Sequence, residues 1–161
     1  MATTVDTIST MTSSEALNHL ASTLDLTNIR LKLADPEEGK GYEVDHLNLM
    51  EQEYRRFLAL HLIHPEADIV PCAMVDEMWH AHILDTAAYR VDCDRIFGHF
   101  LDHFPYFGMR GEQDAQDLMD AYDQTLQHYH EAFGEPADGT WRGVDPVSKC
   151  KRTNCKPQKC R

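Results

Sequence analysis

Apolar side chains recur every three or four residues along most of this chain, and this period limits the possible folds more than any other feature. The pattern is clearest between residues 44 and 63, where six apolar side chains would share one helix face: Val44, Leu47, Met50, Tyr54, Phe57 and Leu58. This helix is expected to stop at His64, because the following Pro65 disfavours α geometry in the residue before it.

Four further segments repeat the period, so the sequence predicts an all-α bundle of about five helices. In chain order, the other stripes are Leu17, Leu20, Leu24 and Ile29; Val75, Met78, Trp79 and His82; Tyr89, Cys93, Ile96, Phe97, Phe100 and Phe104; and Leu118, Tyr122, Leu126, Tyr129 and Phe133. Asp85 and Thr86 would form a turn and cap before the fourth helix. No alternating pattern of useful length predicts a β-strand.

Local signals also divide the chain into parts. Pro105 and Gly108 would end the fourth helix, and the fifth would begin at about Glu112. We expect three parts in chain order: a disordered N-terminal tail (1–12), one helical domain (13–134), and an extended, basic, cysteine-rich tail (135–161). Trp141, in that last part, is a candidate to dock back on the helical domain.

Charge is distributed unevenly along the chain. The net charge is -12, yet six basic residues and no acid lie between Ser148 and Arg161, so the rest of the chain carries -18. Such an acidic body is not expected to bind nucleic acid, because phosphate contacts require a cationic surface. No run of about 18 apolar residues predicts a membrane span, and residues 1–11 lack the features of a secretory signal, so a cytoplasmic location is expected.

The five cysteines are split between body and tail. Cys72 and Cys93 lie in the helical part, whereas Cys150, Cys155 and Cys160 lie in the tail. The tail spacing lacks the CxxC pattern of a structural zinc site, and a reducing cytosol argues against a disulfide framework. These three thiols could join a metal site elsewhere, act in redox chemistry, pair between chains or stay free.

The segment with most chemical potential is Trp79-His80-Ala81-His82, because imidazole is the commonest protein metal ligand. On a regular helix, positions two apart point in nearly opposite directions, so His80 and His82 are not expected to bind one metal ion together. His82 lies on the apolar stripe and would turn inward toward Cys93. His80 shares a face with Asp76, which could orient the imidazole or form an ordinary surface pair.

Three polar side chains fall on stripes expected to face the core, namely His61, His82 and Cys93. Burying such groups is unfavourable unless each finds a partner, so they could satisfy one another or share a metal ion. Alternatively, each histidine bonds a backbone carbonyl or a tyrosine, and Cys93 packs as a small apolar side chain. His103 is a further candidate ligand, but the sequence contains no HExxH motif and so no zincin-type protease is expected.

A family resemblance rests on Val75-Asp76-x2-Trp79-His80-x-His82-x-Leu84, followed by Tyr89, Asp92-Cys93 and Gly98. This pattern resembles the glycine-rich domain-containing protein-like family, with the short bacterial members the most similar, over roughly residues 40 to 135. The resemblance implies that these residues form one recurring unit, and it implies no particular reaction. The chain has 8 glycines and no glycine-rich region, so the stress and developmental roles of plant members transfer poorly.

We therefore predict a small helical protein that binds zinc, copper or iron, because mixed imidazole and thiolate ligands suit these metals. The candidate ligands are His80, His82, Cys93, His103 and His61. Tyr89, Asp76 and Asp92 would be hydrogen-bonding groups behind the ligands, and Trp79 would wall the pocket. If the protein is an enzyme, we expect a metal-dependent oxidoreductase or hydrolase acting on a small molecule or a peptide.

The competing prediction is a non-catalytic interaction module. In this interpretation the same Trp, His, Tyr, Asp and Cys side chains form a structural polar network between helices. The acidic body and the basic tail would then contact a protein partner.

Overall fold

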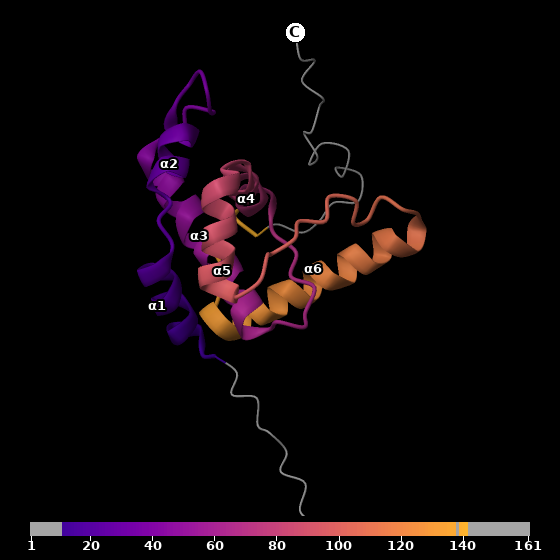
Figure 1. Ribbon diagram of the computed structural model, residues 1–161. Helices are drawn as coiled ribbons and strands as arrows, with labels where there is room; N and C mark the ends of the chain where they lie inside the picture. Colours follow the sequence, from indigo (N-terminus) through magenta and orange to yellow (C-terminus); the bar gives the residue numbers. More distant parts are fainter. Residues whose placement is uncertain (1–10, 138, 142–161) are drawn as a thin grey trace, which may run out of the picture.

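The computed structural model describes residues 11–137 and 139–141, and these ranges contain six α-helices and no β-strand (Figure 1). The helices are α1 (Ser13–Thr23), α2 (Thr27–Ala34), α3 (Val44–Ile63), α4 (Ala73–Leu84), α5 (Thr86–Phe97) and α6 (Glu112–Phe133). The predicted all-α class is confirmed, with one helix more than expected. None of the helices in the described ranges is long and apolar enough to cross a membrane. The predictions for Cys150, Cys155 and Cys160 fall outside these ranges.

The additional helix arises because the first predicted stripe is interrupted. Helix α1 ends at Thr23, and Leu24 adopts an extended conformation. The Asp25 carboxylate then accepts hydrogen bonds from the backbone and side chain of Thr27, the first residue of α2. A short acidic side chain that bonds nearby backbone favours a turn over a continuing helix. The stripe correctly predicted burial of Leu24 and Ile29 but wrongly predicted one continuous helix.

The fourth predicted helix is also shorter than its stripe. Helix α5 ends at Phe97, and Gly98 follows with φ 72°, a left-handed conformation that suits glycine and commonly ends helices. Phe100 and Phe104, predicted to continue the buried stripe, are 49% and 52% exposed. Residues 98–111 therefore form a loop instead of helix, and this loop carries His103.

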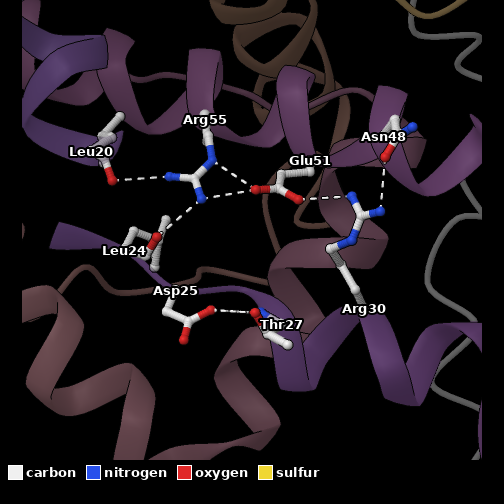
Figure 2. Close-up of polar contacts among 8 residues, drawn as sticks. All are labelled: Leu20, Leu24, Asp25, Thr27, Arg30, Asn48, Glu51 and Arg55. Atoms are coloured by element: carbon white, nitrogen blue, oxygen red, sulfur yellow. Dashed lines mark hydrogen bonds and ion pairs between the residues drawn. The ribbon is translucent and has the colours of Figure 1, made fainter. Parts of the chain in front are cut away.

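Arg55 on α3 joins the first three helices (Figure 2). Its guanidinium donates to the carbonyl oxygens of Leu20 and Leu24 at the end of α1, and also to the Glu51 carboxylate. The other oxygen of Glu51 accepts from Arg30 on α2 at 2.8 Å. The last carbonyls of a helix lack partners within that helix, and α1 has no basic residue in its own last turn. Arg55 supplies the missing cation.

Helix α3 forms the centre of the core and packs against α1, α2, α4 and α6. Its buried face includes Met50, Tyr54, Phe57 and Leu58, each at most 1% exposed. Burial of one such side chain stabilises a fold by roughly 1.5 to 3 kcal/mol. This face therefore supplies much of the rigid support on which α4 is held.

Helix α6 joins the core through its second half, while its first half projects away from the other helices (Figure 1). Tyr129 of α6 donates to the fully buried carboxylate of Glu53 on α3. Trp141 donates its indole N–H to the same carboxylate at 2.8 Å and is 7% exposed. The predicted docking of Trp141 on the helical domain is confirmed.

Candidate metal centre

Three side chains with metal-binding atoms converge between α4 and the loop after α5. Asp76 and His80 lie four residues apart on α4 and share one face, and His103 approaches them from the loop. His103 Nε2 lies 2.9 Å from Asp76 Oδ1 and 2.9 Å from His80 Nε2, while His80 Nε2 lies 3.7 Å from Asp76 Oδ1. This Asp–His–His cluster could hold a metal ion.

The distances within the cluster suit one shared ion. Two ligand atoms that each lie about 2.1 Å from a tetrahedral ion are about 3.4 Å from each other. The distances observed between the ligand atoms of the cluster range from 2.9 Å to 3.7 Å and so include this value. Without an ion, His103 Nε2 would have to share one proton with both His80 Nε2 and Asp76 Oδ1. Three electron-pair donors pointing at one another are better satisfied by a cation.

The cluster is partly open to solvent. The side chains of His80, Asp76 and His103 are 38%, 25% and 17% exposed. An ion there would have protein ligands on one side and positions for water or a small molecule on the other, the arrangement typical of catalytic sites more than of closed structural ones.

A chain of hydrogen bonds holds the loop against α4. Trp79 Nε1 donates to the Tyr89 hydroxyl at 2.9 Å, and that hydroxyl donates to the Leu101 carbonyl at 2.6 Å. The Trp79 ring also packs 4.5 Å from the His103 ring, measured between centroids. Trp79 and Tyr89 therefore fix the position of His103 relative to His80.

The cluster borders a pocket of about 310 Å³. Asp76, Trp79, His80 and His103 all line it. Its other walls are mostly apolar and come from residues 69–71, from the loop at 104–109 and from Leu118 of α6. A small molecule in this pocket would lie next to the cluster.

His82 faces the core and belongs to a separate network. Its Nε2 lies 3.0 Å from the Asp92 carboxylate, and its Nδ1 lies 2.8 Å from the Tyr54 hydroxyl. Because a carboxylate only accepts, Nε2 carries the proton and Nδ1 accepts from Tyr54. Burial lowers the pKa of His82 despite the neighbouring Asp92, so the imidazole is neutral at pH 7. Both nitrogens are occupied, and the structure does not bring His82 to the cluster.

The other two candidate ligands also lie apart from the cluster. Cys93 is a buried free thiol, close enough to Tyr89 to add to the rise in the Tyr89 pKa that burial mainly causes. His61 packs edge-on against Phe57, with 4.8 Å between ring centroids. It lines the same pocket as the cluster but is not one of the three converging side chains.

Asp76 was expected to support a ligand, whereas its carboxylate oxygen is itself one of the three converging atoms. The spacing of four residues between Asp76 and His80 was visible in the sequence and was the available signal. The proximity of His103 was not visible, because its position depends on where α5 ends.

Comparison with known proteins places the chain in a family. A family model described as UCP032817-like matches residues 29–129. The chain belongs to the UCP032817-like family. The expected membership of the glycine-rich domain-containing protein-like family was therefore wrong. No curated protein and no solved structure matches the chain. Membership of the UCP032817-like family assigns no reaction.

Proposed function

We propose that this protein binds one divalent transition-metal ion through Asp76, His80 and His103. The observation that supports the proposal is the convergence of two imidazole nitrogens and one carboxylate oxygen within 2.9 to 3.7 Å of one another. Two histidines and one carboxylate, with further positions open, form the ligand set of many zinc hydrolases and of non-haem iron(II) oxygenases.

Zinc and iron(II) are the metals that this ligand set favours. The predicted choice of zinc, copper or iron included a thiolate ligand, and Cys93 is not part of the cluster, whose two histidines and one carboxylate are the ligand set of zinc and iron(II) sites. Magnesium and calcium prefer ligand sets made entirely of oxygen. An ion held here would act as a Lewis acid and lower the pKa of a bound water.

The residues around the cluster have defined roles in this proposal. Trp79 and Tyr89 hold the His103 loop in place, and the mostly apolar pocket walls border one side of the cluster. The pocket volume of about 310 Å³ suits a small molecule better than a folded partner. We therefore propose metal-dependent chemistry on a small molecule, with hydrolysis or oxidation decided by which metal binds.

Metal analysis tests the proposal directly. Untagged protein would be purified, stripped with a chelator and titrated with Zn²⁺, and with Fe²⁺ under anaerobic conditions. We expect one ion per chain in the wild type and weak or absent binding in a His80→Ala, His103→Ala double variant. A His46→Ala, His99→Ala variant removes two exposed histidines outside the cluster and should retain the ion. Equal loss in both variants, or no binding by the wild type, would contradict the proposal.

The interaction-module alternative, in which the acidic body and the basic tail contact a protein partner, stays a prediction. Within the helical domain, two pairs of the predicted polar network are hydrogen-bonded, Trp79 with Tyr89 and His82 with Asp92, and His82 has a further partner in Tyr54. That network accounts for one histidine of the Trp-His-Ala-His segment. It does not account for the convergence of His80 with His103.

A further inference from the structure

The ion proposed above would add positive charge to a pocket wall that otherwise has little. Its ligands Asp76, His80 and His103 all line the pocket, and among the described residues that line it there is no lysine or arginine. Arg110 follows the lining residue Met109, but its guanidinium is paired with the Asp114 carboxylate at 2.7 Å. A negatively charged group of a bound molecule would therefore have one strong point of attachment, which is the ion itself.

The wall beyond the cluster is mostly apolar. It is formed by residues 69–71 before α4, by Phe104, Phe107 and Met109 in the loop after α5, and by Leu118 of α6. Each ligand methylene that is fully buried against such a wall tightens binding by up to about fourfold. A pocket of about 310 Å³ thus favours a ligand in which an apolar body is attached to the metal-binding group.

A second charged group on the same ligand would be unfavourable. Against the apolar wall, that group would lose its hydration without gaining a partner. The other two acids of the lining, Asp68 and Asp102, are exposed to solvent and would repel a second anionic group near them. They would oppose an anionic group on the ion less, because water and salt screen exposed charges whereas the ion contacts that group directly.

We propose that the molecules recognised by this site are small monocarboxylates with an apolar body. The carboxylate binds the ion at a position that Asp76, His80 and His103 leave open, and the apolar body packs against the wall between the segment before α4 and Leu118. This inference rests on the proposed metal site and adds the class of molecule that binds there. The single carboxylate gives attachment, and the length of the apolar body gives selectivity.

Five simple probes separate the contributions to binding. Acetate, butyrate and hexanoate differ only in the length of the apolar chain, adipate adds a second carboxylate to the far end of hexanoate, and 1-hexanol replaces the carboxylate with a neutral group. Each would be titrated into wild-type protein whose zinc content per chain has already been measured. The two indole N–H signals would be followed by NMR, because Trp79 lines the pocket and Trp141 does not.

We expect hexanoate to bind about tenfold to 100-fold more tightly than acetate, with butyrate between them, because part of four additional methylenes is buried. Adipate and 1-hexanol should each bind at least about tenfold more weakly than hexanoate, adipate because of its second charge and 1-hexanol because it lacks the charge that meets the ion. Hexanoate should shift the Trp79 signal and leave the Trp141 signal unchanged. In Co²⁺-loaded protein, hexanoate should change the visible spectrum of the ion and 1-hexanol should not.

A pair of variants on α6 tests the wall. Leu118→Gln places a polar group in the pocket and should lower the preference for hexanoate over acetate by about threefold to tenfold. Met119→Gln is the matched control, since Met119 is the next residue of α6, is also half-buried and does not line the pocket. It should keep the wild-type preference. Because the two affinities are compared within each variant, a change in zinc affinity does not affect the result.

Zinc stoichiometry separates this inference from the metal proposal. A wild type that takes up no zinc contradicts the metal site and overturns the inference with it. In a wild type with one zinc per chain, the inference alone is overturned if hexanoate binds no more tightly than acetate, or if adipate or 1-hexanol binds as tightly as hexanoate. An unchanged chain-length preference in folded Leu118→Gln protein would also overturn it.

Discussion

Replacing Tyr89 with phenylalanine tests how the loop and the cluster are coupled. The Tyr89 hydroxyl accepts from Trp79 Nε1 at 2.9 Å and donates to the Leu101 carbonyl at 2.6 Å. Phenylalanine keeps the ring, whose centroid lies 4.8 Å from that of His82 and 5.2 Å from that of Phe100. The substitution thus removes two hydrogen bonds while leaving the packing in place.

The size of the effect follows from which atoms lose a partner. The buried Trp79 N–H would be left unpaired, at a cost of about 1 to 3 kcal/mol. The Leu101 oxygen is less buried and can turn to water, so it adds at most about 1 kcal/mol. We expect the free energy of unfolding to fall by about 1 to 4 kcal/mol. Zinc affinity should fall by about tenfold to 100-fold, because Leu101 positions the loop that carries His103.

Urea denaturation followed by circular dichroism measures the first quantity, and competition with a chromophoric chelator measures the second. Tyr106→Phe is the matched control, since Tyr106 lies in the same loop and is 59% exposed. It should change neither quantity. If Tyr89→Phe lowers stability but zinc affinity stays at the wild-type value, the hydrogen bonds from Trp79 to Leu101 do not position the cluster and the reasoning is refuted.

Three further predictions concern the helical body. Arg55→Met should lower stability by about 1 to 2 kcal/mol in urea denaturation, because the carbonyls at the end of α1 lose their cation. An unchanged urea midpoint would show that water replaces the guanidinium as their hydrogen-bond donor. Trp141→Phe should lower stability by about 1 to 3 kcal/mol in the same assay, since the buried Glu53 carboxylate loses a donor. No loss would mean that this hydrogen bond adds nothing to stability. Burial lowers the pKa of His61 from 6.5 to about 4, so the unfolded chain binds more protons and stability falls as the pH drops through that window. Between about pH 7 and about pH 4 the wild type should lose about 2 to 3 kcal/mol of stability that the His61→Phe variant does not lose, as measured by unfolding both proteins at each pH. An equal loss in the wild type and the variant would contradict this prediction.

The helices were predictable where local signals set their ends. The periodicity and Pro65 correctly predicted α3 with its last residue before His64, and the stripe near Glu112 correctly predicted the start of α6. Asp85 accepts from the Ala88 backbone as the predicted cap. The two errors, at Asp25 and at Gly98, occurred where one turn-forming residue outweighed a continuing apolar pattern.

The cluster was only partly predictable for the same reason. The separation of His80 from His82 follows from helix geometry, and the structure confirms that the two rings face different surroundings. The sequence did not correctly predict the partner of the His82 ring. His82 was expected near Cys93, which is adjacent in sequence to its actual partner Asp92 and lies on the next face of α5. Neighbouring residues on a helix point in different directions, so a shift of one position on α5 changes which side chain meets the His82 ring.

By itself, the sequence determined the helical class, the main helix ends and the opposite directions of the two histidines after Trp79, because all three depend on neighbours within about one helical turn. The tertiary structure alone decided that His103 joins Asp76 and His80, and that Tyr54 and Asp92 occupy His82. Those contacts join residues 10 to 28 positions apart. They exist because Gly98 ends α5, because Tyr89 holds the following loop at Leu101, and because the buried face of α3 fixes where α4 lies.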